Sequence, residues 1–225
     1  MKNSVLYILL FFLLNITGAL SENVLIQAKN ITLEKNRELS IFRNEVTIKT
    51  EDGNLIKSDY AEYNKKKGLI VLKNNIVATD SRDNQIETEY AEYFEKDKIF
   101  KSKGYTKIIT SEKYIIEGKN IVFDNSSKYI NSKDDTLVTD LDNNKIFLEN
   151  FEYQIDNNIF KSLGYVKIKD QLNNSYEFSQ IYIDTKKKEM LGTDIKAFFN
   201  DRNFKINDSN KPRVFANTVK LKNNN

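Results

Sequence analysis

Hydrophobic and polar residues alternate with a period of two along most of this chain, after an apolar opening segment. The alternation is interrupted by short polar segments rich in Asn, Asp and Gly, which is typical of half-buried β-strands connected by tight turns. Beyond the opening segment, no stretch has the spacing of an amphipathic helix. The pattern therefore predicts an all-β chain.

A thirty-residue period orders the predicted strands. The sequence Ser58–Tyr63 returns in a closely similar form as Thr88–Tyr93, thirty residues later. The same interval generates six copies, and a seventh begins near Val214, after an insertion around Asn200 to Pro212. Apolar residues recur in fixed columns: Ile26, Ile56, Ile86, Ile116 and Ile146 in one, and Tyr63, Tyr93, Phe123 and Tyr153 in another. Such self-similarity is typical of one structural unit stacked many times.

The phase of the alternation changes once within each strand. A column of residues that tolerate a left-handed backbone marks the second strand of every copy: Asn44, Asn74, Gly104, Asp134, Gly164 and Asp194. A bulge or corner there keeps the apolar side chains on one face of the strand. We therefore expect bent strands that stack as two facing sheets. The predicted fold is an elongated β-jelly roll, a trough of about 14 antiparallel strands with a continuous apolar interior.

Composition excludes several kinds of functional site. The chain has no Cys and no His, so Cys/His zinc sites and Ser–His or Cys–His nucleophiles are excluded within it. Its net charge of +3 is too balanced to indicate a nucleic-acid partner. The acidic residues Asp134, Asp135, Asp140 and Asp142 lack the full ligand pattern of a calcium loop. No column gathers the carboxylates of a carbohydrate-active enzyme. We therefore expect no catalytic residues, no metal and no cofactor.

The opening segment has the form of an export signal. A short basic start precedes the apolar run Val5–Leu14, and the small residues Ala19 and Ser21 suit cleavage after Ser21. The run is too short for an ordinary membrane span, although an uncleaved anchor is the alternative. We expect residues 1–21 to be a cleaved signal peptide, residues 22–222 to form the β-domain, and residues 223–225 to be a tail.

This combination of features resembles the OstA family of lipopolysaccharide-transport proteins, which includes LptA and the periplasmic N-terminal domain of LptD. The resemblance rests on the signal segment, the bent-strand pattern and the repeat Ile56–Tyr63, echoed at Ile86–Tyr93, and it extends over residues 24–222. The segment Arg213–Asn217 is most similar to the LptD version, whereas nothing after Val214 resembles an outer-membrane barrel. The chain is thus expected to be either a free-standing LptA-like shuttle or an N-terminal piece of an LptD-type chain.

The resemblance implies a function and a set of partners. It implies a periplasmic protein, associated with the outer membrane, whose groove holds the acyl chains of lipid A. It also implies end-to-end β-strand pairing with other transport proteins and delivery to an outer-membrane barrel complex. The unprotected terminal strands, Val24–Leu33 and Val214–Leu221, suit such pairing, although simple fraying of the edges is the alternative.

The interior columns supply the candidate lipid-binding residues. These are Ile56, Tyr63, Ile86, Tyr93, Ile116, Phe123, Ile146 and Tyr153. Tyrosine combines an apolar ring with a polar tip, which suits the lip of a groove. The same side chains could instead fill a closed core, as in an exported structural or adhesin-like repeat protein. The lysine runs Lys65–Lys67 and Lys186–Lys188 are either phosphate contacts or solvated turn tips.

Overall fold

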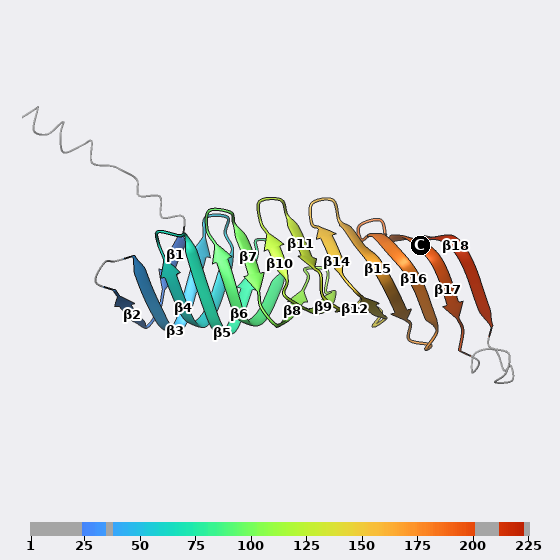
Figure 1. The fold of residues 1–225 in the computed structure, drawn as a ribbon, viewed down its shortest axis with the longest axis horizontal. Coiled ribbons are helices and arrows are strands. Elements are labelled where there is room, and N and C mark those ends of the chain that lie inside the picture. The colour runs from blue at the N-terminus through green and yellow to red at the C-terminus, as the bar shows by residue number, and fades with distance from the viewer. Residues whose placement is uncertain (1–23, 35–37, 201–211, 223–225) are drawn as a thin grey trace, which may run out of the picture.

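The computed structural model describes residues 24–34, 38–200 and 212–222. This part of the chain consists of antiparallel strands and turns, arranged as one long 18-stranded stack (Figure 1). The strands are β1 (Val24–Gln27), β2 (Asn30–Leu33), β3 (Leu39–Thr50), β4 (Leu55–Asn64), β5 (Leu69–Thr79), β6 (Gln85–Phe94), β7 (Ile99–Ser102), β8 (Tyr105–Ile109), β9 (Ile115–Lys119), β10 (Val122–Asp124), β11 (Tyr129–Ser132), β12 (Thr136–Thr139), β13 (Lys145–Leu148), β14 (Phe151–Gln154), β15 (Ile159–Lys169), β16 (Ser175–Asp184), β17 (Glu189–Phe198) and β18 (Arg213–Lys222). The all-β prediction is confirmed.

Several neighbouring short strands are two halves of one bent strand. The pairs β1/β2, β7/β8, β9/β10, β11/β12 and β13/β14 are each interrupted by two or three residues. Each pair occupies the same place in its copy as a long, uninterrupted strand such as β4 or β5. The 18 strands therefore correspond to thirteen bent strands, one fewer than predicted, because the described part of the seventh copy holds β18 alone.

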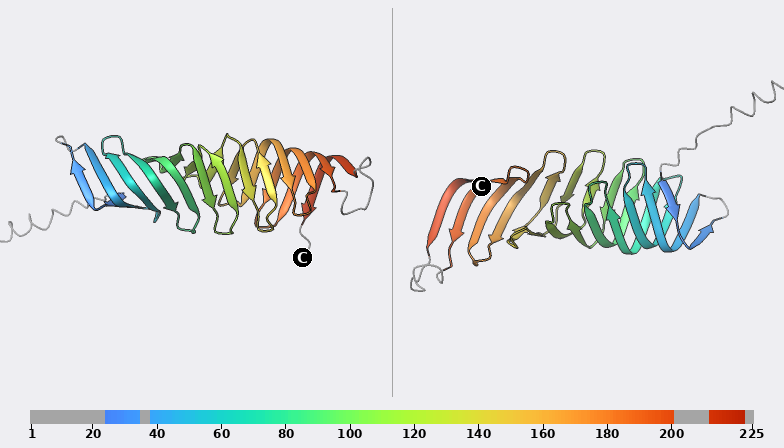
Figure 2. Two further views of the ribbon diagram at one scale, coloured as in Figure 1. Left: turned by 90° about the horizontal axis from the view of Figure 1, so that it is seen from below. Right: turned by 180° about the vertical axis from the view of Figure 1, so that it is seen from behind.

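The two halves of a bent strand belong to different layers. In β6, residues Gln85–Thr88 pair with β8, whereas Ala91–Phe94 pair with β7. One layer, called here the isoleucine layer, contains β1, β8, β9, β12, β13 and the matching halves of the long strands. The other, the aromatic layer, contains β2, β7, β10, β11, β14 and the remaining halves. The elongated stack is seen from two further sides in Figure 2.

The bends join the two layers along one side of the stack. Asn44, Asn74, Gly104, Gly164 and Asp194 have φ angles of 64°, 64°, 81°, 146° and 53°, which confirms the left-handed backbone predicted for that column. Where β3 pairs with β4, the register shifts between Arg43 and Val46, as expected of a bulge. The turns lie at the opposite ends of the strand halves. The cross-section is therefore a V, with a mouth between two rows of turns.

Asp134 is the exception in the column of left-handed residues. It is not among the described residues with positive φ. Hydrogen bonds from neighbouring side chains support this bend: Ser132 Oγ accepts from the Asp134 amide at 3.1 Å, and Thr136 Oγ1 donates to the Asp134 carbonyl at 2.9 Å. Thr106 Oγ1 donates in the same way to the carbonyl of the left-handed Gly104 at 3.3 Å, so such local side-chain bonds occur at a bend with or without positive φ.

Some predicted segments lie outside the described residues. These are the signal peptide at 1–21, the tail at 223–225 and most of the insertion predicted around Asn200 to Pro212. Among the residues that the structure describes, no helix is long and apolar enough to cross a membrane.

Candidate functional site

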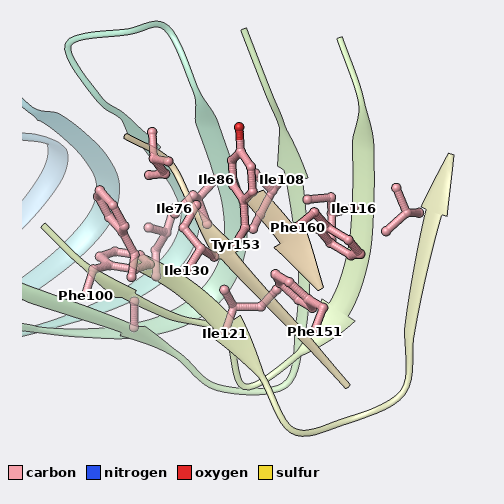
Figure 3. Close-up of a cluster of buried hydrophobic side chains, with 14 of the residues drawn as sticks. Ile76, Ile86, Phe100, Ile108, Ile116, Ile121, Ile130, Phe151, Tyr153 and Phe160 are labelled. Carbon is pink, nitrogen blue, oxygen red and sulfur yellow. The ribbon is translucent and has the colours of Figure 1, made fainter. Parts of the chain in front are cut away.

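Cross-strand pairing joins the predicted apolar columns into two rows along the stack. The isoleucine ladder consists of Ile26, Ile48, Ile56, Ala78, Ile86, Ile108, Ile116, Val138, Ile146, Ile168, Tyr176, Ala197 and Val214, each paired with the next. The aromatic ladder consists of Ser40, Tyr63, Ile70, Tyr93, Phe100, Phe123, Ile130, Tyr153, Phe160, Ile183 and Met190. Figure 3 shows rings of the aromatic ladder, Phe100, Tyr153 and Phe160, clustered with isoleucines of both layers. All of these residues except Ser40, Ala197 and Val214 belong to one shared core or pack against it.

The structure places the eight candidate lipid-binding residues in these two ladders. Seven of them are buried and line two hollows between the layers: Ile56, Ile86, Tyr93 and Phe123 at the first hollow, and Ile116, Ile146 and Tyr153 at the second. Tyr63 lines neither hollow. It is half-buried, and its hydroxyl donates to Glu95 at 2.9 Å. The assignment of these residues to lipid binding stays a prediction.

Both hollows are narrow in this structure. Their cavity volumes are about 30 Å³ and about 50 Å³. Such volumes hold on the order of two to four water molecules. Side chains of the two ladders therefore fill most of the interior, and a lipid chain requires the layers to separate.

Polar contacts cross the mouth beside the first hollow. Lys98 Nζ and Asn125 Nδ2, from two turns of the aromatic layer, each donate to the Asp52 carboxylate at 2.9 Å, from a turn of the isoleucine layer. Arg82 donates in the same way to Asp156 at 2.7 Å. The pKa of Lys98 is raised, mainly by its hydrogen bond to Asp52. These partners lie 46 to 74 residues apart in the chain, so they connect different copies of the repeat.

The second hollow is apolar and has a different rim. Ile116, Val138 and Ile146 of the isoleucine layer face Phe160 and Ile183 of the aromatic layer there. Tyr114 and Tyr153 also line it, and burial is the main cause that raises the pKa of both phenols. Of the ion pairs that the described part of the chain forms, none includes a residue that lines this hollow, although Arg82 of the Arg82–Asp156 pair is close enough to act on the Tyr153 phenol.

The two ends of the stack expose strand edges. Within the described ranges, β1 and β2 pair with β3 alone, and β18 pairs with β17 alone. Large apolar side chains are exposed at both ends: Leu25, Ile31 and Leu33 at one, and Val214 and Phe215 at the other. Unpaired backbone groups on such strands are available to a further strand.

Metal coordination finds no support in the part of the chain that the structure describes. No group of three or more Asp or Glu residues there is arranged to hold a metal ion. Asp140, which resembles part of a calcium loop in sequence, instead caps its own turn. Its carboxylate accepts from the Asp142 and Asn144 amides at 2.9 and 2.8 Å.

Sequence reasoning missed part of the interior lining. Ala78, Phe100, Val138 and Phe160 line the hollows from the second strand of their copies. A signal for them exists, because Phe100 and Phe160 occupy the same column of the thirty-residue repeat. The contacts across the mouth have no comparable signal, since they depend on how one layer is shifted along the other.

Comparison with known proteins adds little to this geometry. No protein-family model matches the chain, and no curated protein matches it. The chain is similar to the crystal structure of LptH, the LptA homologous periplasmic component of the lipopolysaccharide transport device of Pseudomonas aeruginosa, with 10% identity and a TM-score of 0.21 over 86% of this chain and 93% of that chain. It is also similar to the TCP10 domain of Danio rerio CPAP in complex with a STIL peptide, with 11% identity and a TM-score of 0.15 over 65% of this chain and 93% of that chain. Neither similarity is close enough to assign a function.

Proposed function

We propose that this protein carries lipopolysaccharide through the periplasm toward the outer membrane, with the acyl chains of lipid A held between the isoleucine layer and the aromatic layer. The observation that carries the proposal is the pair of continuous apolar ladders that face each other behind a single lateral mouth. An amphiphile with several acyl chains needs this arrangement, because its chains require a dry interior while its sugars remain in water. The resemblance of the repeats to the OstA family supports the same function.

The layers are built so that separation at the mouth leaves the strands intact. Backbone hydrogen bonds of the ladder strands run along each layer, as between Ile86 and Ile108 or between Tyr93 and Phe100. The layers are joined covalently at the bends, on the side away from the mouth. Each acyl methylene transferred from water into the interior contributes about 0.8 kcal/mol, so several chains would offset a modest cost of opening.

The exposed ends suit the proposed partners. The edges of β1, β2 and β18 are available for pairing with another lipopolysaccharide-transport domain, which would extend the trough end to end. An outer-membrane barrel complex is the proposed recipient at one end. This part of the proposal rests on the free edges together with the sequence resemblance.

A second function is favoured by the small size of the hollows. An exported structural or adhesin-like repeat protein would keep the interior closed and filled by its own side chains. The cavity volumes of about 30 and 50 Å³ match that description. Such a protein takes up no lipid, which makes the two functions separable by experiment.

Photo-crosslinking to purified lipopolysaccharide tests the proposal. A crosslinkable residue replaces Ile86 or Phe123, which are buried in the two ladders, or their outward neighbours Glu87 and Val122 as matched controls. We expect adducts at the two interior positions and none at the controls. Adducts at all four positions, or at none, would contradict lipid carriage and favour the closed structural protein.

A further inference from the structure

The two hollows differ in what closes the mouth beside them. At the first hollow, Lys98 and Asn125 are both lining residues and partners of Asp52 across the mouth. At the second hollow, the lining is mostly apolar although it includes Thr110, Glu112 and Thr185, and no residue of this lining takes part in an ion pair formed by the described residues. The same repeat therefore provides two sites of unequal access.

Asp52 is the centre of the closed part of the mouth. Its two carboxylate oxygens accept from Lys98 and Asn125, which belong to successive turns of the aromatic layer. Asn125 is buried, and its side-chain oxygen accepts from Lys128. The side chains of Asp52 and Lys98 are only 28% and 35% exposed, so water screens this pair less than a fully exposed one. Removal of Asp52 would leave the buried Asn125 amide without this acceptor.

Arg82 and Asp156 mark the boundary between the two hollows. Arg82 lies in the turn Asp80–Asn84, whose ends line the first hollow. Asp156 follows Tyr153, which lines the second hollow, by three residues. Their ion pair is about half exposed on both sides and is therefore the weaker contact. A groove opened at the second hollow would meet this bridge first and the Asp52 cluster next.

The second hollow has the chemistry that recognises a hydrocarbon chain. Ile116, Val138, Phe160 and Ile183 provide apolar walls from both layers. Tyr114 and Tyr153 combine an apolar ring with a hydroxyl, as expected where a buried chain meets a polar head group. Thr110, Glu112 and Thr185 also line this hollow, but no Lys or Arg does, so its lining offers no cation to an anionic head group and the alkyl chain is the recognised part.

We propose that the second hollow is where a single acyl chain first enters the groove, and that the Asp52–Lys98–Asn125 cluster with the Arg82–Asp156 pair is a latch that keeps the first hollow shut. The proposal rests on the proposed lipid-carrying function. It assigns a direction to loading, from the middle of the stack toward its N-terminal half. A chain reaches the first hollow after the latch breaks.

Tryptophan quenching tests where an alkyl chain enters. The chain has no Trp, so the tryptophan fluorescence of each variant comes only from the one introduced residue. Phe100→Trp and Phe160→Trp place it at the same repeat column, lining the first and the second hollow. The quencher is an alkyl maltoside detergent brominated on its chain, with the unbrominated detergent as control. We expect half-quenching of the Phe160→Trp protein at a roughly fivefold lower concentration than for the Phe100→Trp protein.

A second comparison tests the latch. Asp52→Ala is added to each tryptophan protein, and Asp97→Ala serves as a matched control that removes an exposed carboxylate beside Lys98. We expect Asp52→Ala to lower the half-quenching concentration of the Phe100→Trp protein toward that of the Phe160→Trp protein. Asp97→Ala is expected to leave both values unchanged. Circular dichroism and a thermal melt confirm that each variant is folded, and Tyr93→Trp with Tyr153→Trp is the replacement pair if either Phe variant fails.

Each outcome decides one part of the proposal. Equal quenching at both hollows, or quenching at Phe100→Trp first, would overturn the entry site. Equal effects of Asp52→Ala and Asp97→Ala would overturn the latch. If neither tryptophan is quenched, crosslinks of lipopolysaccharide to Ile86 and Phe123 distinguish the failures: with crosslinks the entry site alone is wrong, and without them the lipid-carrying function is wrong too.

Discussion

Tyr93 shows how one residue serves both the core and the rim of the mouth. Its ring belongs to the aromatic ladder between Ile70 and Phe100, and the side chain is 5% exposed. Burial is the main cause that raises its pKa, to about 12, and the carboxylates of Asp52, Glu95 and Glu51 raise it further. The phenol is therefore held neutral well beyond the pH at which an exposed tyrosine ionises.

This shift predicts an alkaline loss of stability that Tyr93→Phe removes. Because the folded-state pKa is raised from 10.0 to about 12, the contribution of the neutral phenol is fully present below pH 10 and is lost as the pH rises through 12. We expect the difference in unfolding free energy between the native protein and Tyr93→Phe to change by roughly 2 kcal/mol between about pH 9 and about pH 12. Urea unfolding at several pH values measures it. A difference that stays constant would contradict the prediction, since the other tyrosines titrate in both proteins.

At the scale of the element, the bend determines the fold. Two residues of β3, Asn44 and Glu45, have positive φ and stand opposite a single residue of β4. The same device recurs at Asn74 and Asn75 in β5. Without the extra residue, the apolar side chains beyond the bend would point away from the core. The bulge is thus what allows one strand to contribute to both ladders.

Substitution at Asn74 tests the bend. Its φ of 64° lies in the left-handed region, which glycine adopts without strain and a β-branched residue does not. We expect Asn74→Gly to leave stability nearly unchanged and Asn74→Val to lower the unfolding free energy by about 1–2 kcal/mol. Lys57→Val, an exposed position within β4, is the matched control and is expected to cost little, because Val favours strands. Equal losses for the two Val variants in urea unfolding would refute this role of Asn74.

At the scale of the whole molecule, each bent strand contacts its neighbours in the stack. The most extensive contacts join consecutive strands, such as β3 with β4, β5 with β6 and β17 with β18. Stability of such a stack is approximately a sum of local and nearest-neighbour contributions. A strand at either end lacks one neighbour and therefore part of that sum.

Hydrogen exchange is expected to show that the end strands are less stable than the strands in the middle of the stack. Amides of residues 24–33 and 213–222 should exchange faster than those of β8 to β14, because the end strands open without disturbing the middle. Mass spectrometry of peptides along the native chain measures the protection. Uniform protection from end to end would instead indicate one cooperative unit, contrary to a nearest-neighbour stack.

Much of this architecture could be predicted from the sequence, because the same pattern of apolar, polar and turn residues occurs in six copies of the repeat. The alternation predicted strands, and Asn44, Asn74, Gly104, Gly164 and Asp194 predicted the bends. The bend at Asp134 lies where it was predicted, but the left-handed backbone predicted for Asp134 was wrong, and hydrogen bonds of Ser132 and Thr136 support the bend there. Contacts across the mouth, such as Arg82 with Asp156, could not be predicted, since they depend on the twist of two layers relative to each other.

The thirty-residue repeat makes the length of the trough adjustable in steps. One copy supplies two bent strands of opposite direction, so removing or adding a whole copy preserves the direction of every remaining strand and the pairing at the junction. A single bent strand could not be removed in this way, because its two neighbours would then run parallel. A gene with fewer or more copies of the repeat would therefore encode a trough of the same cross-section but of different length. The distance that one molecule spans would change in increments of two strands.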